Sequence, residues 1–308
     1  MTKKMQGYLW LFLTIFLFST YEIIGHTLTS STTTMFVNAF RFLMGGLVLL
    51  PFALAYIRKN HVKLSKKDYL QLMALGLLNA VLSMNLLQLS FNYTAASTSA
   101  ILFSTNPLFV AIFSSLLLKE KPSKSQLFGL FLGILGSVFV TGGFKTSSLI
   151  GPLLALSAAI LFGFYTVSGK NSTKRLGSLV VNSFSFIFGG SINWIFLAIN
   201  NEPLWQVTSD NWLKLLYLGI FVTGIAYYAY FTGLSSLNTT AGSSVFFVKP
   251  VFASILAWIF LSEAITWNKA IGIVIILLAM KFVMASSTKK DGSDIKKDSL
   301  SQKPTLNS

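Results

Sequence analysis

Long apolar stretches recur along the whole chain, and each is closed off by polar or turn-forming residues. A helix needs about 20 consecutive apolar residues to cross the hydrocarbon region of a bilayer, so each stretch predicts one membrane-spanning helix. The predicted spans are residues 8–28, 34–57, 68–89, 95–118, 124–143, 150–169, 178–199, 211–232, 240–261 and 267–286. The pattern therefore predicts an all-α membrane protein with ten transmembrane helices.

The composition favours a bilayer environment over a soluble fold. Of the 308 residues, 53% are hydrophobic and only 11% are charged, whereas soluble domains carry about 25% charged residues. Too few polar side chains are present to cover a water-exposed surface of this size. This excludes a soluble enzyme, a disordered chain and a nucleic-acid-binding protein, and it makes the lipid bilayer the expected surrounding.

The basic residues are unevenly divided between the two sides of the predicted membrane. With the N-terminus in the cytoplasm, 18 of the 24 Lys and Arg residues fall in cytoplasmic ends and connections. The positive-inside rule then predicts a protein of the cytoplasmic (plasma) membrane with both termini in the cytoplasm. The basic run 58–67 is one of these connections, which favours a topological role over binding to nucleic acid. The polar segment 287–308 is mixed in charge and is predicted to be a disordered cytoplasmic tail.

The two halves of the chain align with each other. At a separation of 144 residues, "VNAFRFLMGG" from Val37 lies over "VNSFSFIFGG" from Val181, with six identities in ten. Each half contains five predicted spans, and an odd number turns the second copy upside-down in the membrane. The sequence therefore predicts a 5+5 inverted-topology repeat made of residues 8–143 and 150–286. Secondary transporters often have this architecture, with the solute site between the halves near the middle of the bilayer.

Two corresponding segments carry a further signal, "TAASTSAILFSTNPLFVAIFSSLLLKEKPSKSQLFGLFLGILG" and "TTAGSSVFFVKPVFASILAWIFLSEAITWNKAIGIVIILLA". Each has a Pro in mid-helix, a Glu thirteen residues later and a Gly nine residues beyond that. With these segments and "RFLMGGLVLLPFAL" in the first half, the chain resembles the EamA family of the drug/metabolite transporter superfamily over about residues 8–286. The resemblance implies a five-plus-five carrier of small metabolites, amino acids or amphiphilic compounds, often directed outward. It does not name the solute.

Lys249 is the sharpest candidate for contact with a solute, because a charge at bilayer depth needs a partner, a wet cavity or a function. It lies near the middle of its span and directly precedes Pro250, which removes a backbone donor and disrupts the helix. The corresponding pair in the first half is Asn106 and Pro107, so the helix break is symmetric while the charge is not. A structural Lys249 paired with Glu22, or bonded to carbonyl groups, is the alternative.

Glu22 and Arg41 lie at similar depth in the first two spans, so the sequence permits an ion pair between them. Such a pair has two interpretations, a structural link between neighbouring helices or a part of the solute or proton site. Glu22 is the main candidate for proton coupling, since a buried carboxyl group can exchange a proton near neutral pH. His26 follows one helical turn later and is a second candidate.

Other polar side chains lie within the predicted spans and complete the candidate site: Asn38, Asn85, Tyr165, Tyr227 and Tyr230. Asn side chains in membranes more often join helices than bind ligands, so both interpretations remain open for them. Glu22, Arg41 and Lys249 together leave a charge of +1, which favours a carboxylate-bearing solute.

The sequence thus predicts an alternating-access carrier for a small metabolite, in particular an amino acid or another carboxylate. The alternatives are an exporter of amphiphilic or cationic compounds and a non-transporting membrane scaffold or assembly protein. An enzyme is not expected, because Cys is absent and no Ser–His pair or acidic dyad stands at a suitable depth. No cofactor or metal is expected either. A glycine run at Gly129, Gly133 and Gly136 permits close helix contact, within one molecule or in a homodimer.

Overall fold

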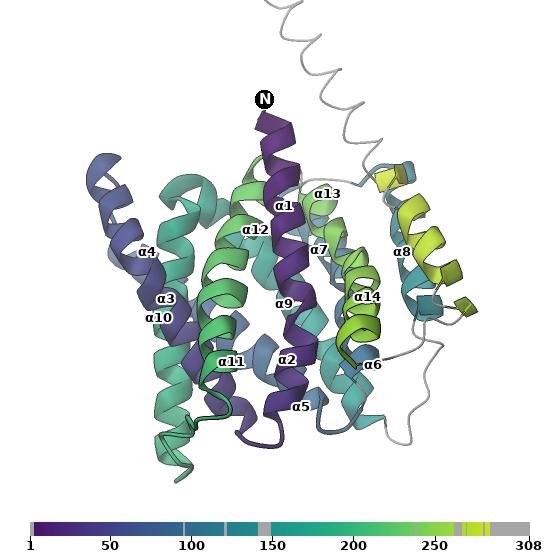
Figure 1. The fold of residues 1–308 in the computed structure, drawn as a ribbon. Coiled ribbons are helices and arrows are strands. Elements are labelled where there is room, and N and C mark those ends of the chain that lie inside the picture. Colours follow the sequence, from purple (N-terminus) through teal and green to yellow (C-terminus); the bar gives the residue numbers. More distant parts are fainter. Residues whose placement is uncertain are drawn as a thin grey trace, which may run out of the picture.

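The computed structural model describes residues 3–94, 96–119, 122–140, 149–237, 239–261, 267–268, 270–279 and 281–283. All regular structure in these residues is helical, and they contain no strand (Figure 1). The elements are α1 (Lys3–Ser19), α2 (Tyr21–Leu28), α3 (Thr34–Lys59), α4 (Lys66–Gly76), η1 (Leu77–Ser83), α5 (Met84–Ser90), α6 (Ala96–Phe103), α7 (Asn106–Leu117), α8 (Lys124–Val140), α9 (Ile150–Leu176), α10 (Ser178–Ile199), α11 (Trp212–Tyr217), η2 (Leu218–Ile225), α12 (Ala226–Ser235), α13 (Thr239–Ser243), η3 (Ser244–Phe247) and α14 (Lys249–Leu261). One more helix runs over Ala270–Val283. The predicted tail 287–308 lies outside the described residues.

Seven helical stretches are long and apolar enough to cross a membrane: Met5–Leu28, Thr34–Lys59, Lys66–Ser90, Ser99–Leu117, Ile150–Leu176, Ser178–Ile199 and Trp212–Ser235. The other three predicted spans coincide with shorter apolar helices in the described residues, so the count of ten stays a prediction. Large apolar side chains point outward from the bundle, and Phe52 and Leu116 are 61% and 71% exposed. A bilayer is the surrounding in which such side chains are stable without a protein partner.

One predicted span ends later than the sequence pattern indicated. The apolar run stops at residue 169, whereas α9 continues to Leu176 and ends at Gly177, whose φ of 86° suits glycine. Lys170 directly follows the predicted span, where a cytoplasmic connection is expected, but it is buried within this helix. Its ammonium group donates hydrogen bonds to the Leu237 carbonyl oxygen at 3.0 Å and to Thr239 Oγ1 at 2.9 Å. These bonds compensate the buried charge and let the helix extend beyond its apolar run.

Irregular helical segments occur at corresponding places in the two halves. The π-helical segments η1 and η2 begin at Leu77 and Leu218, each in the middle of a long span. Helices α7 and α14 begin at Asn106 and Lys249, each one residue before a proline. Proline is accommodated in the first turn of a helix, where its missing N–H would have no partner. The two halves therefore share local departures from regular α-helix as well as sequence.

Helices α3 and α10 pack closely through glycine. A Cβ atom added at Gly46 would lie 2.8 Å from the backbone nitrogen of Ile187, and one added at Gly190 would lie 2.6 Å from that of Leu43. The later residue of α3 meets the earlier residue of α10, so the two helices run antiparallel. Because Leu43 and Ile187 are 144 residues apart, as are Gly46 and Gly190, the second contact repeats the first with the two helices exchanged.

A second pair of glycine contacts also recurs with the two halves exchanged. A Cβ atom at Gly45 would lie 2.8 Å from the carbonyl oxygen of Gly219, and one at Gly189 would lie 2.6 Å from that of Gly76. Gly45 and Gly76 belong to the predicted first half and correspond to Gly189 and Gly219 in the second. Each half thus places its second span against the third span of the other half.

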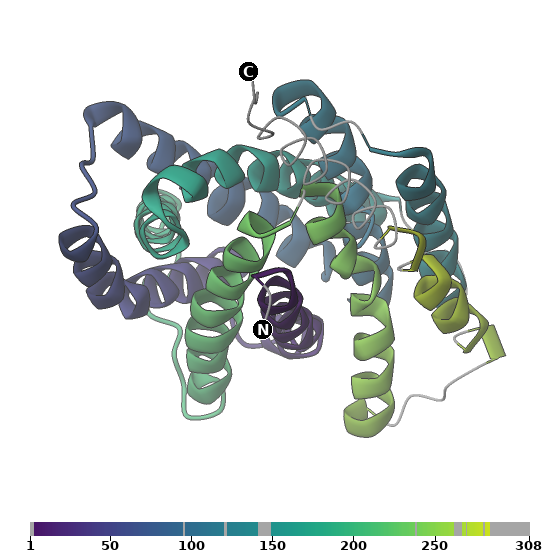
Figure 2. The ribbon, with the colours of Figure 1, turned by 90° about the horizontal axis from the view of Figure 1, so that it is seen from above.

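The glycine run of α8 packs within the molecule. A Cβ atom at Gly129 would meet Val283, and one at Gly136 would meet Ile276, both on the helix over Ala270–Val283. Figures 1 and 2 show this helix pair side by side at one edge of the bundle. Gly133 faces the ring of Phe247. The face that we considered for a homodimer is therefore occupied by the chain's own helices.

Candidate functional site

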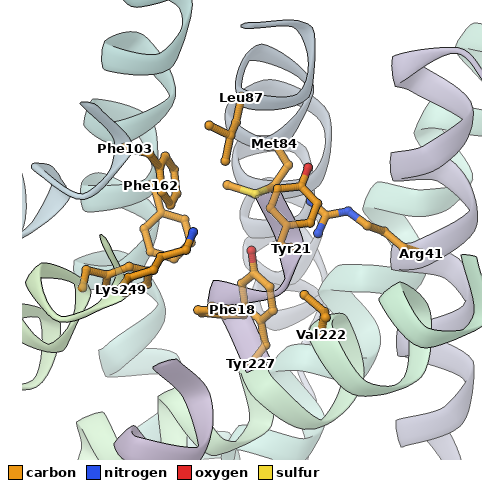
Figure 3. Close-up of a pocket in the computed structure, with 11 residues that line it drawn as sticks. Phe18, Tyr21, Arg41, Met84, Leu87, Phe103, Phe162, Val222, Tyr227 and Lys249 are labelled. Carbon is orange, nitrogen blue, oxygen red and sulfur yellow. The ribbon is translucent and has the colours of Figure 1, made fainter. Parts of the chain in front are cut away.

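A small cavity lies inside the bundle (Figure 3). The surrounding elements are α1, α2, α3, α5, α6, α9, η2, α12, η3 and the start of α14. Nine apolar or aromatic residues and two cationic ones line it: Phe18, Tyr21, Met84, Leu87, Phe103, Phe162, Val222, Tyr227, Phe246, Arg41 and Lys249. Its volume of about 20 Å³ leaves room for about one water molecule. The site is closed in this conformation, and its aromatic walls pack tightly. The ring centroid of Phe18, for example, lies 4.9 Å from that of Tyr227.

Lys249 and Glu22 form a buried ion pair beside this cavity. Glu22 stands in the first turn of α2 and Lys249 begins α14, and their side chains are only 3% and 2% exposed. The Lys249 ammonium also lies 5.3 Å from the centroid of the Phe103 ring, on which it can make a cation–π contact. The pair uses Glu22 Oε1, and Glu22 Oε2 has no hydrogen-bond partner in the described part of the chain. One carboxylate oxygen is therefore available to a further donor.

Arg41 forms the opposite wall and is not paired with Glu22, contrary to one of our sequence expectations. Its Nε donates to Asn38 Oδ1 at 2.7 Å, and its guanidinium carbon lies 4.4 Å from the ring centroid of Tyr21 and 4.6 Å from that of Phe42. Aromatic faces attract a guanidinium group, so these rings partly replace the missing carboxylate. Nη2 of this buried group has no hydrogen-bond partner among the described residues. Figure 3 shows the guanidinium reaching toward Tyr21.

The two sequence candidates Asn38 and Asn85 belong to one chain of hydrogen bonds. Asn38 Nδ2 donates to Asn85 Oδ1 at 2.6 Å, and Asn85 Nδ2 donates to Asn193 Oδ1 at 2.8 Å. Asn193, on α10, was not among the predicted site residues. The sequence did contain a sign of it. Asn193 lies eleven residues, or about three helical turns, after Asn182, which places both asparagines on the same face of their span.

The predicted tyrosines lie around the same centre. Tyr227 lines the cavity and donates a long hydrogen bond of 3.5 Å to Asn79 Oδ1, while Tyr230 donates to Thr166 Oγ1 at 3.3 Å. Tyr165 is buried behind them, with its ring centroid 6.4 Å from that of Tyr227. Tyr21 was missed, although it corresponds to Tyr165 at a separation of 144 residues.

Two other candidates do not reach the cavity. Asn106 is buried, but its Nδ2 donates to the Phe103 carbonyl oxygen at 2.8 Å, so it bridges the break between α6 and α7. It is absent from the cavity lining, unlike Lys249 at the corresponding position of the second half. His26 is exposed near the end of α2. Pro107 and Pro250 each follow the first residue of a helix and act on backbone geometry.

Comparison with known proteins assigns the chain to a family. The model of a family described as EamA-like transporters matches it twice, over residues 5–142 and 149–285. The chain belongs to the EamA-like transporter family. The resemblance carried by the twin proline segments is thereby confirmed, and the family consists of transporters. With seven long apolar helices, this EamA-like protein is an integral membrane protein.

Several relatives of this EamA-like protein bear names of the same kind. An uncharacterized transporter of Clostridium kluyveri is 34% identical over 302 residues, which cover 95% of this chain and 96% of the relative. The uncharacterized transporter YetK of Bacillus subtilis is 27% identical, covering 89% and 86%. A chloroplastic WAT1-related protein of Arabidopsis thaliana is 25% identical, covering 82% and 63%. A solved crystal structure at 22% identity superposes with a TM-score of 0.75, covering 92% of this chain and 98% of the other, and shares the fold alone.

Proposed function

We propose that this EamA-like protein is a secondary carrier that moves an amino acid, or another small carboxylate, across the cytoplasmic membrane. One observation carries the proposal. Two buried charged groups of opposite sign lie at the closed cavity: Arg41 lines it, and Glu22 lies beside it, paired with the lining residue Lys249. Among the described residues, Arg41 Nη2 and Glu22 Oε2 have no hydrogen-bond partner. Leaving such atoms buried costs free energy, which a solute bearing both an anionic and a cationic group would recover.

The cavity walls narrow the solute class. Nine of the eleven lining residues are apolar or aromatic, which suits a solute with an apolar side chain. Arg41 and Lys249 outweigh Glu22 by one positive charge, which favours a carboxylate over an amine. An amino acid with an apolar side chain meets both conditions. Its carboxylate would bind Arg41, and its ammonium group would bind Glu22.

We propose the 5+5 inverted repeat of residues 8–143 and 150–286 as the architecture, with ten membrane-spanning helices and both termini in the cytoplasm. Three observations support it: the family model matches twice, the equivalent helices α3 and α10 run antiparallel, and the glycine contacts recur with the halves exchanged. A molecule built this way can face either side by exchanging the conformations of its halves.

The small cavity fits the closed stage of this cycle. A volume of about 20 Å³ holds about one water molecule, so the helices around it must separate to admit an amino acid. The Glu22–Lys249 pair joins α2 to α14 across the site and is broken or rearranged when they part. Glu22 then loses its partner and becomes free to take up a proton, which is the proton-coupling step that we propose.

The test is flux into liposomes containing the purified protein. Labelled L-leucine, L-valine and L-phenylalanine are compared with isoamylamine, isobutylamine and phenethylamine, which are the corresponding amines without the carboxylate. We expect saturable flux of the acids alone, lost in Arg41→Leu and in Lys249→Met. Lys214→Met, which removes an exposed cation on α11, is the matched control and should leave flux unchanged. Flux of the amines without the acids would overturn the carboxylate assignment, and no flux of any solute would favour the scaffold.

A further inference from the structure

A one-way chain of hydrogen bonds runs from Arg41 to the backbone of η1. Arg41 Nε donates to Asn38, Asn38 to Asn85 and Asn85 to Asn193, over 2.7, 2.6 and 2.8 Å. Asn193 Nδ2 then donates to the Ala80 carbonyl oxygen at 3.1 Å. We call these three asparagines, Asn38, Asn85 and Asn193, the amide relay.

The chemistry of the two ends fixes the direction of the relay. An arginine Nε can only donate, and a backbone carbonyl can only accept. Every amide between them must therefore accept with its oxygen and donate with its nitrogen, and none can flip without losing two hydrogen bonds. Asn38 and Asn193 are fully buried, so no water competes for these groups. Chains of hydrogen bonds with one polarity also strengthen each member.

The relay also crosses between the two predicted halves. Arg41 and Asn38 lie on α3 and Asn85 on α5, whereas Asn193 lies on α10 of the second half. The Asn85–Asn193 bond crosses into the second half, and the Asn193–Ala80 bond returns to the first. Asn38 alone could hold Arg41 only loosely, because its amide would be free to rotate if its nitrogen had no acceptor. The anchor that stops this rotation is the Ala80 carbonyl, which is reached through Asn193.

We propose that Asn193 is a positioning residue for the solute site. It contacts no solute itself. Through Asn85 and Asn38 it sets the Arg41 guanidinium so that Nη2 stays available at the cavity wall for a carboxylate. This role rests on the proposed function for its physiological meaning, while the orientation of Arg41 can be tested without any solute.

The first test reads the orientation of Arg41 directly. Arg41, Arg58 and Arg175 are the only arginines of the chain, so protein labelled with ¹⁵N-arginine in nanodiscs gives three Nε–H resonances. In Asn193→Leu we expect the Arg41 resonance to shift and its exchange with water to rise about fivefold, the factor that corresponds to one ordinary hydrogen bond. Asn193→Thr keeps a group that both accepts and donates, and should restore part of the wild-type spectrum.

Asn182→Leu is the matched control, because it makes the same change on the same buried face of α10. Neither polar atom of the Asn182 side chain has a hydrogen-bond partner in the described residues, so this residue stands outside the relay. Its replacement should leave the Arg41 resonance in place. An unchanged Arg41 resonance in folded Asn193→Leu, or an equal shift in Asn182→Leu, would overturn the positioning role.

The second test asks whether Asn193 acts through Arg41. With L-leucine as the probe, Asn193→Leu should raise KM severalfold and change the maximal rate less. In an Arg41→Leu background we expect no flux, so the binding of L-leucine is measured instead, and Asn193→Leu should produce no further loss of binding. An equal further loss in that background would refute action through Arg41. If the arginine spectrum changes as expected but no acid is transported, the proposed function fails and the positioning of Arg41 stands.

Discussion

The buried pair of Glu22 and Lys249 gives the most informative prediction, because stability and transport should respond to it differently. Lys249→Met removes the cation and leaves a carboxylate buried at 3% exposure beside apolar rings. Breaking a buried pair from one side costs about 3–5 kcal/mol. Each kcal/mol lowers the melting temperature by roughly 2–4 °C for a protein of 150–250 residues, and by somewhat less for this longer chain of 308 residues, so a loss on the order of 10 °C is expected.

Removing both charges should restore most of that loss. Replacing an entire buried ion pair by apolar groups of similar size is often neutral or stabilising, so the double variant Glu22→Leu, Lys249→Met should melt near the wild type. The melting temperature is measured in detergent from the fluorescence of the six tryptophans. A double variant no more stable than Lys249→Met would refute the pairing.

Transport shows whether the pair has a role beyond stability. The double variant also lacks Glu22, which we place at the ammonium group of the solute, so we expect its stability to return while L-leucine flux stays lost. Regained L-leucine flux in the double variant would show that neither charge serves the solute. As a control, Glu22→Gln alone keeps the size of the side chain while removing its charge and its titration, and it should flatten the dependence of flux on pH. Flux that still varies with pH in this variant would contradict proton coupling through Glu22.

Three further predictions follow from other parts of the fold. Gly46→Ala should destabilise the protein by about 1–3 kcal/mol, because its methyl group would press on α10. Gly224→Ala is the control and should be tolerated, because the atom nearest to its new methyl group would lie at 3.5 Å. Equal melting temperatures of the two variants would contradict the close contact at Gly46. Asp68→Ala should cost about 1–2 kcal/mol in thermal unfolding, because its carboxylate accepts the hydrogen bonds from Ser65 that complete the capping box of α4. Arg175→Gln should cost less, because that ion-pair partner of Asp68 is 53% exposed. An Arg175 effect larger than that of Asp68 would refute this order. The chain has no cysteine, so Val222→Cys places a single thiol in the cavity. Maleimide should label this thiol slowly, and L-leucine should change the labelling rate. Rapid labelling that does not respond to L-leucine would contradict a closed site.

The sequence pattern predicted the apolar helices well, because the thickness of the bilayer sets how many consecutive apolar residues a spanning helix needs. It was wrong at the end of α9, since hydropathy cannot detect that Lys170 finds acceptors on a distant segment and allows the helix to continue. The sequence placed Glu22 and Arg41 at similar depth and Lys249 in the middle of its span, and the structure has Arg41 and Lys249 on one cavity with Glu22 beside it. The sequence could not choose among the partners of Glu22, because that choice depends on how each helix is rotated about its axis.

The amide relay shows a second limit of the sequence. Asn38 and Asn85 were recognisable as polar groups within spans, but their order in one hydrogen-bonded chain depends on the crossing of α3, α5 and α10. Asn193 completes that chain and corresponds to the apolar Leu49 in the first half, so the repeat gave no hint of it. A residue unique to one copy has to be found from its spacing to other polar residues on its own helix, here Asn182, or from the polar groups that its neighbours leave unsatisfied.

The exchanged glycine contacts have a consequence for how a carrier of this design acquires a preferred orientation. In a carrier of this design, the inward-facing and outward-facing conformations differ in which half adopts which conformation. If the contacts of the two halves were identical, the two conformations would be equally populated. A mutation at Gly46 alters one contact and spares its counterpart at Gly190, so it shifts the balance between facings as well as the overall stability. An imbalance of about 1.4 kcal/mol favours one facing tenfold. In a carrier built from two such halves, small sequence differences between the halves are therefore sufficient to make one of the two conformations predominate at rest.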